Sequence, residues 1–303
     1  MSRPPRAPLP KGPIEFPREV WSLFDQYVHG DIDRRGFLAK VGRFAVGGWT
    51  AATILEALNP RFAEAAEVAA DDPRIARSFI EFASREGYGR GRGLLAVPKT
   101  ASAKRPGVLV IHENRGLNPH IEDIALRLAL AGYVAFAPDA LFPLGGYPGD
   151  EDKARALFAT LDQTKTTEDF IAALGVLEKR PECNGTVGAV GFCYGGGMAN
   201  TLAVRVPSVA AAVPFYGGQP KTEDVPKIRA AIQCHYAEMD DRINAGIPAF
   251  AAALKAHGIQ HQIHTYPGTQ HGFNNNTTPR YHKAAATLAW SRTLDFFKQH
   301  LGA

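Results

Sequence analysis

Cys193 is the residue in this sequence whose surroundings point most directly to chemistry. It stands in Gly191-Phe192-Cys193-Tyr194-Gly195, between an apolar run and a segment with helical spacing. Glycines on either side allow a tight strand-to-helix turn that presents the thiol at a helix N-terminus. The free amides and the helix dipole at such a terminus favour a thiolate and a developing oxyanion. The pattern therefore predicts a nucleophilic cysteine for acyl transfer, with a small buried structural cysteine as the alternative.

Two groups further along the chain can complete a set of nucleophile, base and acid. Asp240 and Asp241 follow the predicted strand 232–236, and His271 follows the last predicted strand. Catalytic groups gather at the carboxyl ends of parallel strands, and the chain order nucleophile, acid, histidine is that of α/β hydrolases. We predict Asp240 as the acid, with Asp241 as the alternative, and His271 as the base.

Positioning these groups requires an alternation of strands and helices, and the hydropathy pattern predicts one. Continuous apolar runs indicate strands that are buried on both faces of a parallel sheet. The predicted strands span 93–98, 108–112, 133–137, 187–192, 210–215, 232–236 and 262–266. The predicted helices span 119–131, 151–162, 166–180, 246–257 and 280–300, and another follows Cys193 and ends before Pro207. This alternation predicts the α/β-hydrolase fold, with a mostly parallel central sheet and helices on both faces.

Residues 1–70 differ in character from the rest of the chain. A proline-rich and basic start leads to the pair Arg34-Arg35, to Phe37-Leu38, to an apolar stretch over 44–58 and to Ala63-Glu64-Ala65. This layout is typical of a twin-arginine export signal, and an amphipathic N-terminal helix that carries two arginines is the alternative. The apolar stretch is too short, and too interrupted by charges, for a membrane span.

We therefore predict a leader over 1–70 that engages the twin-arginine export machinery, followed by a hydrolase domain over 71–303. Cleavage after Ala65 or Ala70 would release the domain into the periplasm, and an uncleaved leader would retain it as an anchor. The domain stays in the cytoplasm if the leader is not functional.

The composition limits the partners and cofactors. The chain has 303 residues and a net charge of +4 from 34 basic and 30 acidic residues, with no basic run in the folded region, so no nucleic-acid surface is predicted. Three cysteines without a CxxC pair, and the absence of HExxH, predict neither a zinc site nor a disulfide framework, although one bridge plus one free thiol is left open. The glycines after Cys193 form neither G-x-G-x-x-G nor a P-loop, so no cofactor is expected.

From about Arg105 to Leu301 the sequence resembles the dienelactone hydrolase family, also called carboxymethylenebutenolidases. The resemblance rests on four segments: 112–118, 191–197, Asp240 with Ile247-Pro248 downstream, and 271–273. It implies a Cys193–His271–Asp240 triad and an oxyanion hole from the backbone amides of Tyr194 and Asn114. It also implies that Glu113 contacts the catalytic thiol and is displaced when substrate binds. A salt bridge from Glu113 to Arg115 or Arg127 is the alternative.

One departure from the family pattern bears on the substrate. Family members that act on dienelactone carry an arginine about four residues after the triad histidine, and Asn275 stands there in this chain. Arg115 or Arg280 is the candidate to replace that arginine. Arg115, Tyr147 and Asn275 are predicted to contact the substrate, and Tyr194 is a further candidate for lining its pocket. The predicted function is hydrolysis of activated esters or lactones. The alternatives are a general carboxylesterase, a ligand-binding protein on the same fold, and a thiol redox sensor that uses Cys234.

Overall fold

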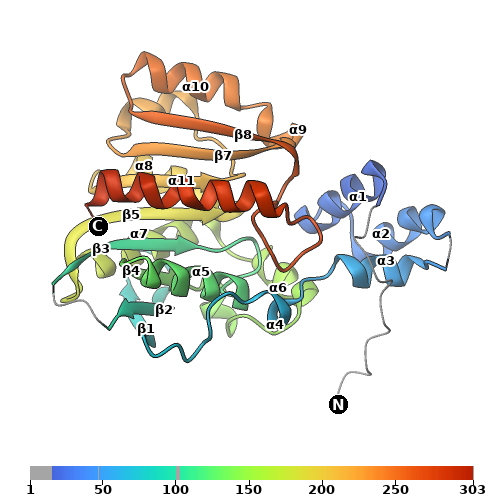
Figure 1. Ribbon diagram of the computed structural model, residues 1–303, viewed down its shortest axis with the longest axis horizontal. Coiled ribbons are helices and arrows are strands. Elements are labelled where there is room, and N and C mark those ends of the chain that lie inside the picture. Colours follow the sequence, from blue (N-terminus) through green and yellow to red (C-terminus); the bar gives the residue numbers. More distant parts are fainter. Residues whose placement is uncertain (1–15, 47, 100–102, 303) are drawn as a thin grey trace. The chain divides into compact units, whose positions relative to one another are not determined.

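The computed structural model describes residues 16–46, 48–99 and 103–302 (Figure 1). The chain divides into two compact units, Met1–Arg61 and Phe62–Ala303. The proline-rich start of the predicted leader, residues 1–15, lies outside the described residues. The predicted division into a leader over 1–70 and a domain over 71–303 stays a prediction.

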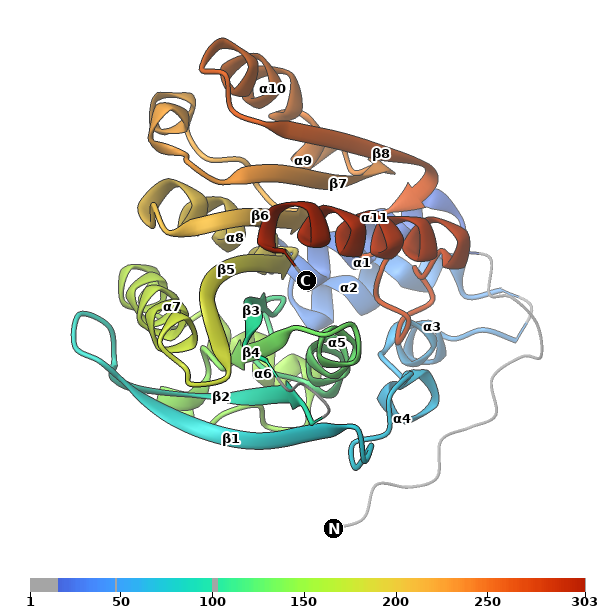
Figure 2. The same ribbon diagram turned by 60° about the vertical axis from the view of Figure 1, so that its left-hand side comes forward.

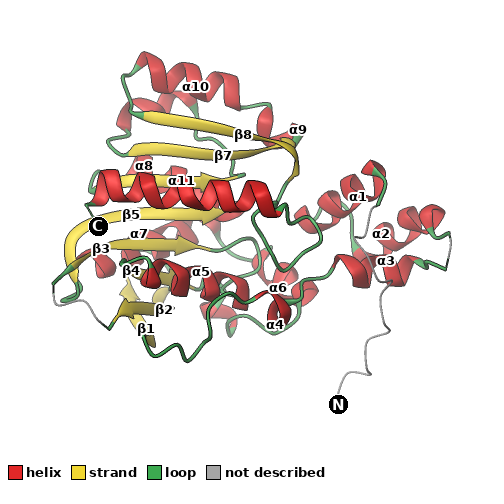
Figure 3. Cartoon of the chain, in the orientation of Figure 1, coloured by secondary structure: helices red, strands yellow, loops and turns green. Residues whose placement is uncertain are grey.

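The unit Phe62–Ala303 is built on an eight-stranded sheet in the order β1-β2-β4-β3-β5-β6-β7-β8 (Figure 3). Strands β3 to β8 run parallel, whereas β1 and β2 form an antiparallel edge. The strands are β1 (Ile75–Ser84), β2 (Gly89–Pro98), β3 (Arg105–Ile111), β4 (Val134–Pro138), β5 (Cys183–Phe192), β6 (Val209–Phe215), β7 (Ala231–Met239) and β8 (His261–Gln270). The sheet brings the ends of β3, β5, β6, β7 and β8 to one edge, as the predicted site requires.

Helices cover both faces of this sheet (Figure 2). One face packs against α5 (Pro119–Leu130) and α11 (Lys283–Leu301), and the other packs against α7 (Gln163–Glu178), α8 (Tyr194–Arg205) and α10 (Ile247–Ala256). Two shorter helices, α6 (Glu151–Phe158) and α9 (Asp241–Asn244), border the carboxyl edge of the strands, and α4 (Phe62–Ala65) opens the unit. The predicted α/β-hydrolase fold is confirmed by this mixed sheet with helices on both faces.

The strand β1 was not predicted, and β2 begins earlier than the predicted 93–98. Exposed charged side chains, among them Glu81 in β1 and Arg90 and Arg92 in the first half of β2, interrupt the apolar pattern, so only the second half of β2 shows a continuous apolar run. Their pairing extends from Ile75 opposite Pro98 to Ser84 opposite Gly89. Cross-strand contacts between distant residues, rather than local hydropathy, stabilise such an edge hairpin.

The unit Met1–Arg61 contains three α-helices among its described residues, α1 (Arg18–His29), α2 (Arg34–Val41) and α3 (Ala51–Leu58), and a short 3-10 helix, Gly42–Phe44, follows α2. They share a buried apolar cluster, in which the Tyr27 and Phe37 rings stack at 5.1 Å. Members of the cluster in α3 include Ile54, Leu55 and Leu58. The predicted apolar stretch over 44–58 is therefore partly a short helix inside a small helical unit.

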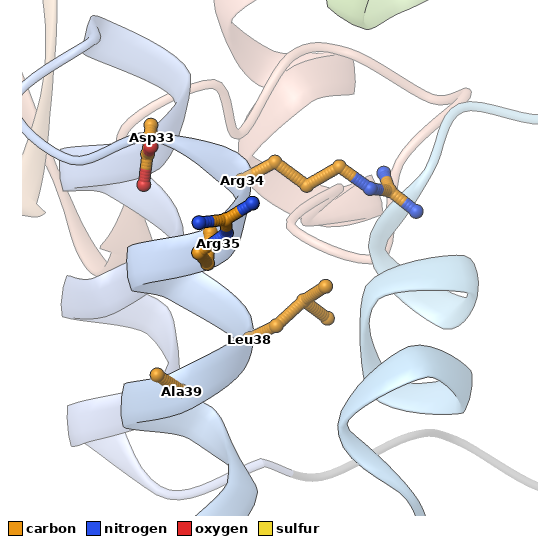
Figure 4. A pocket seen from close by; sticks show the side chains of 5 residues that line it. All are labelled: Asp33, Arg34, Arg35, Leu38 and Ala39. Carbon is orange, nitrogen blue, oxygen red and sulfur yellow. The ribbon is translucent and has the colours of Figure 1, made fainter.

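The paired arginines open α2. Asp33 is the N-cap residue, and its carboxylate accepts a hydrogen bond from the Gly36 amide at 2.7 Å. Figure 4 shows a hollow on this helix that is lined by Asp33, Arg34, Arg35, Leu38 and Ala39. Among the described residues, none of the helices combines the length and the apolar character that a membrane-spanning segment needs.

Candidate active site

The turn at Cys193 has the strained geometry that presents a nucleophile. Cys193 separates β5 from α8 and has φ 56° and ψ −111°, in a region that side-chain-bearing residues rarely occupy. A Cβ on Gly191 would lie 1.9 Å from the Gly195 carbonyl oxygen, and a Cβ on Gly195 would lie 2.2 Å from the Ile111 carbonyl oxygen. The backbone therefore approaches too closely at both positions for any residue larger than glycine, which explains the two glycines on either side of Cys193 in the sequence.

Asp240 and His271 form a buried pair at the ends of β7 and β8. The Asp240 Oδ2 and His271 Nδ1 atoms lie 2.6 Å apart, and both side chains are almost fully buried. The other carboxylate oxygen of Asp240 accepts a bond from the Ile243 amide at the start of α9. The alternative acid, Asp241, is the first residue of α9 and is exposed. Of the two aspartates, Asp240 is therefore the one that orients the imidazole.

The thiol lies beside this pair. The Cys193 sulfur is within 4.8 Å of a ring nitrogen of His271. Burial alone would lower the pKa of His271, but the charge of Cys193, the hydrogen bonds to Asp240 and Cys193 and the charge of Asp240 outweigh it and raise the pKa to about 10. The arrangement therefore favours an imidazolium next to a thiolate at neutral pH.

The two other thiols differ sharply from Cys193. All three cysteines are free, and Cys183 and Cys234 are buried, whereas Cys193 is partly exposed. Burial raises the pKa of both Cys183 and Cys234, the latter to about 12. A bridge between any two cysteines, left open by the sequence, is absent.

The segment after β3 supplies the backbone of the predicted oxyanion hole. The start of α8 packs directly against the end of β3, since the Cβ position of Gly195 lies only 2.2 and 2.7 Å from the carbonyl oxygens of Ile111 and His112. This contact places the start of α8, of which Tyr194 is the first residue, beside the backbone that leads to Asn114. The Tyr194 ring packs edge-on against Phe158 at 4.7 Å.

His112 fixes this segment, a role that the sequence did not predict. Its Nε2 accepts a hydrogen bond from the Ala140 amide at 3.1 Å, so the proton is on Nδ1, which donates to the Glu113 carbonyl oxygen at 2.5 Å. The ring is fully buried, and burial lowers the pKa of His112, which keeps the ring neutral. His112 therefore holds the backbone that carries Glu113 and Asn114.

Glu113 is buried and is held by Asn275. The Asn275 Nδ2 donates to Glu113 Oε2 at 3.1 Å, while Asn275 Oδ1 accepts bonds from the amide and hydroxyl of Thr277 at 3.1 and 2.6 Å. These two bonds from Thr277 fix which end of the Asn275 amide faces the glutamate. Asn275, predicted to touch substrate, is thus placed as the partner of Glu113.

The alternative salt bridges of Glu113 do not form among the described residues. Arg115 Nε pairs with Glu151 Oε2 at 2.6 Å, and Arg127 pairs with Asp123 and with Glu67. Arg115 and Arg127 therefore both have acidic partners other than Glu113.

Arg115 and Tyr147, both candidate substrate contacts, meet at Glu151. The Tyr147 hydroxyl donates to Glu151 Oε1 at 2.8 Å, and Arg115 Nη1 donates to Asn114 Oδ1 at 2.7 Å. Burial raises the pKa of Glu151 and of Tyr147. The sequence did not single out Glu151, because a glutamate at the start of a helix is unremarkable. The other candidate cation, Arg280, lies beside the histidine loop, with its guanidinium 3.2 Å from the Cβ position of Gly272.

A strained strand-to-helix turn at Cys193, a buried histidine–aspartate pair and this sheet order are those of the α/β-hydrolase fold. Comparison with known proteins shows to which family within this fold the chain belongs. The model of the dienelactone hydrolase family matches residues 92–301, and a model described as YqhI-like matches residues 11–44. The chain belongs to the dienelactone hydrolase family and is a hydrolase of carboxylic esters, so both predictions are confirmed.

Individual relatives agree with this family. A protein of Escherichia coli (strain K12) named "Putative carboxymethylenebutenolidase" is 32% identical over 222 residues, which cover 68% of this chain and 82% of that protein. Protein usf of Aquifex pyrophilus is 34% identical over 224 residues, which cover 69% of this chain and 94% of that protein. A crystal structure from Klebsiella pneumoniae, described as "Putative Dienelactone Hydrolase", aligns with a TM-score of 0.64 at 27% identity, over 74% of this chain and 99% of that one.

Proposed function

We propose that this enzyme hydrolyses activated esters and lactones through a cysteine acyl-enzyme, with Cys193 as nucleophile, His271 as general base and acid, and Asp240 as its orienting partner. The observation that carries the proposal is the contact of the strained Cys193 turn with the buried His271–Asp240 pair. Nucleophile, base and orienting acid in mutual contact are the arrangement that acyl transfer requires.

The reaction follows from this arrangement. The Cys193 thiolate attacks the ester carbonyl, and the amides of Tyr194 and Asn114 donate hydrogen bonds to the oxygen on which the negative charge develops. The His271 imidazolium gives its proton to the leaving oxygen, which leaves a thioester on Cys193. Neutral His271 then removes a proton from water, the hydroxide attacks the thioester, and the thiolate is released with the proton back on His271.

Two features favour particular substrates. A thiolate is easily expelled from a tetrahedral intermediate, so productive turnover needs a good leaving group such as an enol or aryl oxygen. The amide of Asn275 is already engaged by Glu113 and Thr277, and the charge of Arg115 is balanced by Glu151. We therefore propose that esters and lactones without a carboxylate are turned over faster than dienelactone.

The proposal is tested by assaying the full chain against a panel of aryl esters, enol esters and lactones, with dienelactone included. Cys193→Ala is expected to abolish turnover, and mass spectrometry of the parent quenched during turnover is expected to show one acyl group on Cys193. Cys183→Ala, which removes a buried thiol in the core, is the matched control and is expected to retain activity.

Turnover that survives in Cys193→Ala would refute the cysteine mechanism. A parent without turnover, whose Cys193 is alkylated no faster than a thiol in an unfolded peptide, would indicate a ligand-binding protein on the same fold.

We also propose that the leader directs export by the twin-arginine route to the periplasm. The support is the Arg34-Arg35 pair ahead of Phe37-Leu38, in a segment that a separate family model matches over residues 11–44. In a bacterial host, the parent is expected in the periplasmic fraction, and the variant with both arginines changed to lysine is expected in the cytoplasm. A parent that stays in the cytoplasm would contradict the proposal.

A further inference from the structure

Tyr216 is a fully buried tyrosine that directly follows β6, and its hydroxyl has no hydrogen-bond partner among the described residues. Buried phenols generally find a partner, because an unpaired polar group loses its bonds to water without replacement. Such an orphaned group in a folded protein therefore needs an explanation. The neighbouring active site provides one.

Tyr216 lies next to Cys193 at the carboxyl edge of the sheet. Phe192 of β5 is in register with Phe215 of β6, and the Cys193 amide donates to the Phe215 carbonyl oxygen at 3.0 Å. The two residues that follow, Cys193 and Tyr216, therefore leave the sheet side by side. The Tyr216 ring also packs against the His271 imidazole, with the ring centroids 5.0 Å apart. The phenol thus adjoins both the nucleophile and the base.

The backbone of Tyr216 is strained in the same way as that of Cys193. Its φ is 38°, and these two are the non-glycine residues with positive φ in the described part of the chain. A bulky residue in this region is an outlier that persists only where its surroundings determine it. The Tyr216 amide donates to the His235 carbonyl oxygen at 2.7 Å, and Phe273 packs edge-on against the ring at 5.6 Å. The fold therefore holds the phenol in one position despite the strain.

The sheet order determines which side of the nucleophile the phenol occupies. Strand β3, which leads to Asn114, flanks β5 on one side, and β6, which leads to Tyr216, flanks it on the other. The predicted oxyanion hole lies toward β3. The leaving oxygen, which takes its proton from His271, lies toward the imidazole against which Tyr216 packs.

We infer that the Tyr216 hydroxyl is a catalytic hydrogen-bond donor to the leaving oxygen of the bound ester or lactone and, after acylation, to the water that replaces it. This inference rests on the proposed acyl-transfer function. The hydroxyl keeps its own proton throughout, because His271 supplies the proton that departs with the leaving group. Burial, together with the charges of Glu113 and Cys193, raises the pKa of Tyr216, so the phenol stays protonated at neutral pH.

The test compares Tyr216→Phe with the parent on p-nitrophenyl acetate and on phenyl acetate, whose leaving group is the more basic. Loss of one donor is expected to lower kcat/KM about 10-fold for the first ester and about 100-fold for the second. The midpoint of thermal unfolding is expected to match or exceed that of the parent, because the deleted hydroxyl is unpaired and the ring is retained. A purely structural tyrosine would give no dependence on the leaving group.

Tyr133→Phe is the matched control. Tyr133 is also buried, but it precedes β4 at the opposite edge of the sheet and packs against Phe297. Its variant is expected to keep the parental rates with both esters. Rates within twofold of the parent for Tyr216→Phe, or an equal loss with both esters, would overturn the inference and leave the proposed function intact. A parent that hydrolyses neither these esters nor any member of the wider panel would overturn both.

Discussion

Replacing Asp240 by asparagine preserves the shape of the side chain but removes the carboxylate that, together with the charge of Cys193, raises the pKa of His271. The two side chains are buried and lie 2.6 Å apart, so solvent does little to screen the loss. Removing one partner of a buried charged pair costs about 3–5 kcal/mol. Since about 1.4 kcal/mol corresponds to a factor of ten, we expect kcat/KM to fall roughly 150- to 5000-fold in Asp240→Asn.

The assay has two readouts, ester hydrolysis and the rate at which iodoacetamide alkylates Cys193 between pH 6 and 9. We expect alkylation at the low end of this range to slow in Asp240→Asn, because a less basic His271 leaves more of the thiol protonated. Asp241→Asn is the control, since that side chain is exposed at the start of α9. Parental activity in Asp240→Asn together with a large loss in Asp241→Asn would refute the assignment of the acid.

Three further predictions follow from other parts of the structure. Gly191→Ala places a Cβ 1.9 Å from the Gly195 carbonyl oxygen, so we expect loss of esterase activity and a lower midpoint of thermal unfolding. Gly175→Ala is the control: its Cβ enters open space in α7, so we expect the parental activity and the parental midpoint. Asn275→Ala removes the donor to Glu113, so we expect an altered pH profile of kcat/KM, and an unchanged profile would show that Asn275 does not act through Glu113. The pKa of His271 is raised to about 10 in the folded chain, against 6.5 in the unfolded chain. Its contribution to stability is therefore complete below pH 6.5 and is lost as the pH rises through 10. In urea unfolding, we expect the free energy of unfolding to decline more steeply between pH 6.5 and 10 in the parent than in His271→Ala.

The parallel core of the sheet was predictable because the hydropathy of its strands matches their burial. Strands such as β5 and β6 are buried on both faces, and their sequences are continuous apolar runs. The antiparallel edge was not predictable, because most of β1 is exposed or half-buried and its sequence shows neither a continuous apolar run nor a strict alternation. In the first unit, a helix that carries the two arginines was anticipated only as an alternative, and α1 and α3 were missed, since the basic and apolar composition that suggests an export signal does not reveal that Phe37 and Leu55 share a buried cluster.

The positions of Cys193, Asp240 and His271, the proposed triad, were predictable for a different reason: each of them directly follows a strand, at the carboxyl edge of the sheet. The residues that surround the triad were not predictable in this way. Asn275 and Glu113 are 162 positions apart, and the link between them depends on where two loops meet. The pairing of Arg115 with Glu151, and the strain at Tyr216, likewise depend on packing that no local pattern records.

The cleavage position of the predicted leader can be argued from Asp123. This buried carboxylate accepts hydrogen bonds from the amides of Glu67 and Val68 at 3.0 and 2.9 Å, and it also pairs with Arg127. Cleavage after Ala70 would remove both amides and leave a buried charge with fewer donors, at a cost of about 1–3 kcal/mol for each lost bond. Cleavage after Ala65 would retain both. If the leader is removed, we therefore expect the mature chain to begin at Ala66. The intact mass of the exported protein measures this directly, and a mass that corresponds to a start at Asp71 would show that these bonds do not determine the site.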